Sequence, residues 1–302
     1  MTKPGHLEFN FIYIVQSLGA DEPPTGSYLD MFATRPRVEG MSRSGLSIGA
    51  EVVDIATAAD LFAFLERVCL EVETNGRSPI LHLEIHGSSD QQGLVLRSFE
   101  FVPWQALMEP LTRINRATGN NLLLTLAVCH GAWLGTILSA ARPAPFWAVI
   151  GPSTSEHPVV LFPAFEAFYA TLLDDLDGGK AVGALFNAAA AKGKHSFSVL
   201  HGERLFANAF RRYVAEQCNP DAIERRVAAI IDEGKRRAAA GRATVTEATW
   251  VELESTIKRR MADSRPAFEE YRRRFFMIDV WPENAERFPL TYEQILDASD
   301  RA

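Results

Sequence analysis

The chain has 302 residues, of which 47% are hydrophobic and 23% charged, and its formal net charge is −7. A chain of this length can bury a full core and carry an added subdomain. The acidic balance argues against non-specific binding to nucleic acid, and no apolar run is long enough for a membrane helix. All of the net charge falls in residues 1–200, because residues 201–302 hold 18 basic and 18 acidic side chains.

Cysteine usage and the first residues bear on the cellular setting. Cys69, Cys129 and Cys218 are an odd number without metal-ligand spacing, and the first six residues lack a signal-peptide pattern. Together these features predict a reduced, cytoplasmic protein that needs no metal or other cofactor.

In chain order, the first expected element is a strand over residues 9–15, followed by a Pro/Gly/Ser-rich passage from Ser17 to about Gly49 that predicts a long loop. A second strand is expected at Glu51–Ile55. Thr57 and Asp60 then have the spacing of a capping box, which predicts the start of an amphipathic helix reaching about residue 74.

One motif inside the expected loop has a rival interpretation. Gly45 to Gly49 matches G-x-S-x-G, the nucleophile elbow of α/β-hydrolases. That elbow needs a strand before it and a helix after it. Residues 41–44 are a poor strand and 51–55 indicate a strand, so we interpret the match as fortuitous.

Two apolar runs end in reactive side chains. Residues 80–85 lead into His86 and Gly87, and residues 122–128 lead into Cys129, with a helix from Pro103 to about Arg116 between them. In an open α/β sheet, chemistry collects at the carboxyl ends of parallel strands. The pattern therefore predicts neighbouring parallel strands that place His86 and Cys129 across one crevice.

Those residue types suit acyl transfer. Cys129 would be the nucleophile and His86 the general base that takes its proton, while the N–H groups of Gly87 and Cys129 would form an oxyanion hole. A lone cysteine after a strand is more often a structural residue than a catalytic one. We favour a catalytic role for Cys129 only because His86 and Gly87 precede it in the expected chain order. His82 competes for the role of base, because it would lie on the same strand face as His86.

The remaining elements complete the expected fold. A last strand is predicted at residues 196–200. These elements predict an α/β domain over residues 1–200, with a mostly parallel sheet flanked by helices. Residues 201–302 show helical apolar stripes throughout and predict a helical C-terminal region, which could cover the sheet, recognise a substrate or receive an activating partner.

The order of strand, His-Gly, helix, strand and Cys resembles the caspase-like cysteine peptidases, and most closely the bacterial CHAT-domain proteins, over roughly residues 50–200. The similarity continues past the cysteine, where residues 144–151 look like the next core strand and residues 162–169 and 181–188 resemble the two helices of CHAT domains. The resemblance implies a caspase-like sheet and a cysteine endopeptidase with His86 as base, Cys129 as nucleophile and Gly87 as oxyanion donor. It also implies a protein or peptide substrate, an activating partner protein, and a role in bacterial defence or programmed cell death.

The chain departs from that pattern at one position. Metacaspases carry an acidic residue two positions before the cysteine, where it contributes to binding a basic substrate side chain. This chain has Ala127 there, so the resemblance does not by itself imply specificity for arginine or lysine. Glu84, Asp90 or a residue of the 152–160 segment remain candidates to line a substrate pocket, so the preferred substrate residue stays open. The alternative function is a catalytically silent caspase-like module that binds a partner or small effector through the same crevice.

Overall fold

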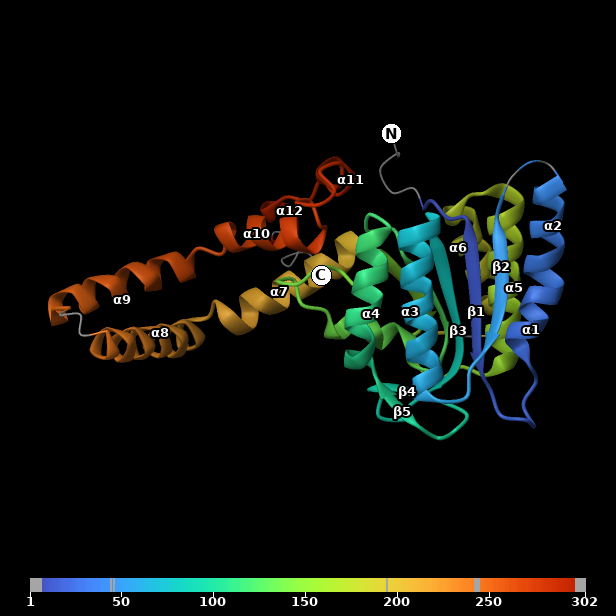
Figure 1. The fold of residues 1–302 in the computed structure, drawn as a ribbon, viewed down its shortest axis with the longest axis horizontal. Helices are drawn as coiled ribbons and strands as arrows, with labels where there is room; N and C mark the ends of the chain where they lie inside the picture. The colour runs from blue at the N-terminus through green and yellow to red at the C-terminus, as the bar shows by residue number, and fades with distance from the viewer. Residues whose placement is uncertain (1–6, 44, 46, 194, 242–244, 297–302) are drawn as a thin grey trace.

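The computed structural model describes residues 7–43, 45, 47–193, 195–241 and 245–296, and it shows a sheet between two helical layers (Figure 1). Within these residues the main strand order is β2-β1-β3-β6-β7-β8; every pair is parallel except β7–β8. Short strands β4 and β5 extend the end of β3 with antiparallel pairing. The strands are β1 Phe11–Ser17, β2 Gly49–Asp54, β3 Pro79–Gly87, β4 Gly93–Val95, β5 Phe101–Pro103, β6 Leu123–Ala127, β7 Ala148–Pro152 and β8 Phe197–His201.

The predicted fold class, α/β with a mostly parallel sheet flanked by helices and followed by C-terminal helices, is confirmed. Side chains alternate across each strand, so the sheet separates two apolar cores. On β1, Tyr13 and Val15 face α3 (Ala58–Asn75) and α4 (Trp104–Ala117), whereas Ile12 and Ile14 face the opposite layer. That opposite layer contains α5 (Pro158–Asp175) and α6 (Gly178–Ala190).

The prediction of a long loop between Ser17 and about Gly49 is wrong. The chain instead forms α1 (Thr25–Leu29), a π-helical turn η1 (Asp30–Thr34) and α2 (Arg35–Arg43). Pro36 lies in the first turn of α2 and has no N–H to donate, and the wider π turn directly precedes it. This helical segment packs against α5 and so covers the sheet face that carries Ile12 and Ile14.

Two local predictions are confirmed. The Thr57 side chain accepts a hydrogen bond from the Asp60 N–H at 3.2 Å, and the Asp60 carboxylate accepts one from the Thr57 N–H at 2.9 Å, which completes the capping box of α3. The G-x-S-x-G match is not an elbow, because helix α2 precedes it and strand β2 begins at Gly49. Leu46 within the motif lies outside the described residues.

The C-terminal helices fall into two groups. Helix α7 (Gly202–Gln217) packs against β8, and α10 (Arg265–Phe275) packs against α7. Phe206, Phe210 and Phe268 from these two helices belong to the same core as the α3 face. Helices α8 (Pro220–Ala240) and α9 (Glu247–Ala262) form a hairpin that projects away from the sheet (Figure 1). The short helices α11 (Asn284–Arg287) and α12 (Tyr292–Leu296) follow α10.

These contacts place α7 against the edge strand β8 and join α10 to the same hydrophobic core. The division into residues 1–200 and 201–302 stays a prediction, although the two parts share one aromatic core. In the described part of the chain, none of the helices combines the length and apolar character needed to cross a membrane.

Candidate active site

The register between β3 and β6 brings the two predicted residues together. His82 pairs with Thr125 and Glu84 pairs with Ala127 in a parallel ladder. Two residues further along each chain, the same register leads to His86 and Cys129 at the carboxyl ends of neighbouring strands. The expectation that the strands before His86 and Cys129 are parallel neighbours is confirmed.

Gly87 lies against the backbone of Cys129. A Cβ atom at position 87 would be 1.8 Å from the Cys129 carbonyl oxygen and 3.2 Å from its Cα. Only glycine permits this approach, because any side chain would begin inside the neighbouring backbone. The backbone of Gly87 is therefore adjacent to the nucleophile candidate, as an oxyanion donor must be.

A cavity of about 230 Å³ lies at this end of the sheet and has both His86 and Cys129 in its wall. Three glutamates, Glu22, Glu84 and Glu156, also line it, and no lysine or arginine is among its lining residues. The rest of the wall is largely apolar. It comprises Leu18, Pro23, Thr25, Ile85, Ala127, Pro158, Leu161 and Phe162.

His86 has a carboxylate partner that the sequence did not indicate. Its Nε2 lies 2.9 Å from Oε1 and 3.0 Å from Oε2 of Glu22, a residue of the β1–α1 connection. The Gly19 N–H also donates to Glu22, at 2.5 Å. These bonds, first from Gly19 and then from His86, hold the pKa of the Glu22 carboxyl below its ordinary value. An ionised Glu22 fixes the Nε2–H tautomer, which leaves Nδ1 free to accept a proton.

The Cys129 thiol has a different partner. Its Sγ lies 3.8 Å from the Glu156 carbonyl oxygen, and the Glu156 side chain accepts hydrogen bonds from the Ser196 N–H and hydroxyl at 2.7 and 2.8 Å. Among the described residues, the hydrogen bonds of Cys129 and His86 therefore run to Glu156 and Glu22 and not to each other. Catalytic hydrogen bonds often tighten only when substrate is bound.

His82, the rival base, is a core residue. Its ring is fully buried and bonds Thr125 Oγ1 at 2.9 Å and Glu84 Oε1 at 3.3 Å. Thr125 in turn bonds the buried Tyr169 hydroxyl at 2.7 Å, and burial raises the pKa of that phenol. His82 does not line the cavity, so it is unsuited to meet a substrate.

His130, next to the nucleophile candidate, forms hydrogen bonds to the segment that follows β7. It has a positive φ of 61°, and its N–H donates to the Thr154 carbonyl at 3.1 Å. Its Nε2 bonds the Ser155 hydroxyl at 3.1 Å. His130 therefore anchors the segment that carries Glu156 beside the thiol.

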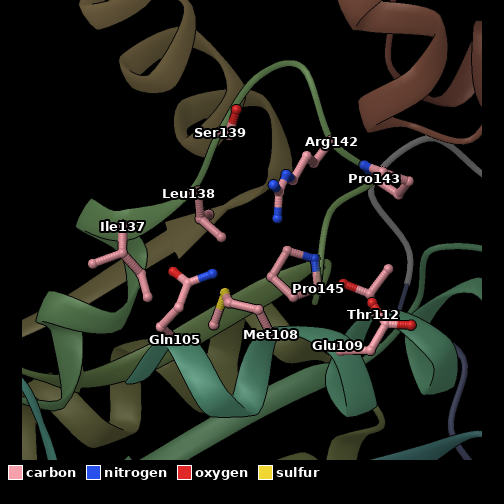
Figure 2. A pocket seen from close by; sticks show the side chains of 10 residues that line it. All are labelled: Gln105, Met108, Glu109, Thr112, Ile137, Leu138, Ser139, Arg142, Pro143 and Pro145. Carbon is pink, nitrogen blue, oxygen red and sulfur yellow. The ribbon is translucent and has the colours of Figure 1, made fainter. Parts of the chain in front are cut away.

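Larger hollows lie elsewhere and contain neither His86 nor Cys129. One of about 420 Å³ separates α4 from the segment after the 3₁₀ turn η2 (Gly131–Ile137), with Gln105 and Met108 facing Leu138 and Arg142 across it (Figure 2). Another, of about 690 Å³, opens at the amino ends of β6 and β7. The smaller cavity is the candidate site because it alone of the three joins a thiol, an imidazole and carboxylates.

Neither the scan against protein-family models nor the search of curated proteins found a match for this chain.

Proposed function

We propose that this chain is a cysteine endopeptidase. The observation that supports it most directly is the placement of His86 and Cys129 in the wall of one cavity, at the carboxyl ends of adjacent parallel strands. His86 would take the thiol proton, and the Cys129 sulfur would attack the scissile carbonyl carbon. The peptide nitrogen would leave with the proton held by His86, and water would then hydrolyse the thioester.

Two further groups have roles in this proposal. Glu22 orients the His86 ring and stabilises its charged form once it holds the proton. The N–H groups of Gly87 and Cys129 would stabilise the negative oxygen of the tetrahedral intermediate, since the backbones of these two residues lie against each other.

An exposed apolar patch supports a protein or peptide substrate. Tyr28, Met31 and Phe32 on α1 and η1 are 38%, 55% and 54% exposed. The Tyr28 ring contacts both Phe32 and Phe162, and Phe162 also lines the cavity. Exposed apolar side chains that adjoin a site are typical of surfaces that bind a partner.

The sequence resemblance is the basis for a proposal about the location, activation and biological role of the enzyme. We propose a cytoplasmic enzyme that acts on one or a few proteins, is switched on by an activating partner, and serves bacterial defence or programmed cell death. All three cysteines are free thiols, in keeping with a reducing compartment.

The test compares wild type, Cys129→Ala, His86→Ala and the double variant on a peptide library at equal protein concentration. Each single substitution should abolish cleavage, and the double variant should be hardly worse than either one, because the residues act as a unit. Cleavage by Cys129→Ala at the wild-type rate would overturn the proposal.

One observation favours the alternative, a silent binding module. The Cys129 thiol lies 3.8 Å from the Glu156 carbonyl oxygen, and among the described residues it has no hydrogen bond to an imidazole. If wild type cleaves nothing in the presence of activating cell extract but binds peptides through the same cavity, the alternative replaces the peptidase.

A further inference from the structure

The charged side chains in the wall of the candidate cavity are mainly acidic. Its wall carries three glutamates and no lysine or arginine, and these carboxylates differ in how deeply they lie. The side chain of Glu22 is 39% exposed and serves His86, whereas the side chain of Glu84 is only 6% exposed. Glu84 is therefore the buried carboxylate of the cavity.

The Glu84 carboxylate has two polar partners, and neither of them is a lysine or an arginine. Thr25 donates to one carboxylate oxygen, and His82 lies against the other at 3.3 Å. Among the described residues, Glu84 forms no ion pair with a lysine or arginine. A buried carboxylate is stabilised by a cation within hydrogen-bond distance, and the open cavity is where one could enter.

The rest of the cavity wall could accommodate the apolar stem of a cationic side chain. Leu18, Ile85, Leu161 and Phe162 surround the space with apolar atoms. Lysine and arginine bury their methylene stems against apolar surface and keep only the head group polar. The cavity of about 230 Å³ is below the size of about 300–1,000 Å³ that is usual for whole small ligands, so it fits one side chain.

We infer that Glu84 selects a lysine or arginine side chain as the residue just before the scissile bond. The cationic head group would bond the Glu84 carboxylate while the substrate carbonyl lies against the Cys129 sulfur. This inference rests on the proposed function, because it names the substrate class of the same site. Of the three candidates from the sequence, Glu84 and, within the 152–160 segment, Glu156 line the cavity, whereas Asp90 does not.

The first experiment measures cleavage of peptides that differ only in the residue before the scissile bond: arginine, lysine, glutamine, leucine or aspartate. Wild type should prefer arginine or lysine over glutamine by about 100-fold, the effect of a buried charge pair. Glu84→Gln keeps the side-chain volume and removes the charge, so it should lose that preference. Asp90→Asn, which removes a nearby carboxylate outside the cavity, should keep it. Preference for leucine or aspartate would overturn the inference and leave the peptidase proposal standing.

The second experiment needs no turnover. Agmatine, which carries a guanidinium at one end of a four-carbon stem and an ammonium at the other, should slow the alkylation of Cys129 by iodoacetamide in wild type and in Asp90→Asn. It should give no protection in Glu84→Gln, and neutral butylurea should protect none of the three. Absence of protection by agmatine in wild type overturns the inference. Protection without any peptide cleavage overturns the peptidase proposal while the cation site stands. A thermal melt of each variant shows that it is folded.

Discussion

The carbonyl oxygen of Cys129 lies where a side chain on Gly87 would begin, 1.8 Å from the position of its Cβ atom. Gly87→Ala should therefore push the ends of β3 and β6 apart, abolish peptidase activity and lower the free energy of unfolding by about 2 kcal/mol or more. Urea unfolding and peptide cleavage measure the two effects.

Gly183 in α6 is the matched control for that change. A Cβ atom there meets no atom within 4 Å. Gly183→Ala should raise the free energy of unfolding by about 0.5–1 kcal/mol, because alanine is the better helix residue. A Gly87→Ala protein as stable and active as wild type would contradict the close approach of the two strands.

The two histidines of β3 should respond differently to removal. His82 is fully buried and bonded on both nitrogens, so His82→Ala should lower the free energy of unfolding by about 2–4 kcal/mol. The His86 side chain is half exposed, and His86→Ala should change that free energy by no more than about 0.5 kcal/mol while abolishing activity. A stable, inactive His82→Ala beside an active His86→Ala would reverse the assignment of the base.

Glu22 should affect both kcat and the loss of folding stability at low pH. Glu22→Gln should lower kcat by about 100-fold, because the amide no longer fixes the His86 tautomer. The exposed Glu39 of α2 supplies the control, since Glu39→Gln should leave kcat unchanged. Unchanged kcat in Glu22→Gln would remove it from the mechanism.

The pH dependence follows from the same carboxyl. The pKa of Glu22 is lower in the folded protein than its ordinary value of 4.5, so the ionised form stabilises the fold above that pH. This contribution is lost as the pH falls through the folded pKa. The stability difference between wild type and Glu22→Gln should therefore shrink between about pH 5 and about pH 3, as urea unfolding at each pH would show.

The three thiols should react with iodoacetamide in a fixed order. Cys129 borders a cavity beside an imidazole, Cys218 is half-buried at the end of α7, and Cys69 is 1% exposed. Burial also raises the pKa of the Cys69 thiol, which reduces its thiolate fraction. Mass spectrometry of the folded protein should find Cys129 modified first and Cys69 last. Equal labelling of all three would argue against an activated Cys129.

The sequence predicted the His86 and Cys129 strands because each reactive residue directly follows an apolar run, and strand pairing then sets their spacing. Glu22 could not be found in that way, and for Glu156 the sequence indicated only the segment that contains it, residues 152–160. Their positions depend on how two connecting segments fold back over the strand ends. The helical segment before β2 was missed because Pro36 and Gly40 are helix breakers in isolation, whereas packing against α5 stabilises the helix in the protein.

Glu84 lines the cavity while its partners lie in the core, through His82 to Thr125 and Tyr169. A mutation that changes the charge at Glu84 therefore also disturbs hydrogen bonds that stabilise the fold. During evolution, a new substrate preference would be reached more easily through lining residues nearer the surface, such as Phe162 and Pro158, than through the cavity floor. Related chains that have diverged in substrate should then differ at these lining residues and retain the buried network.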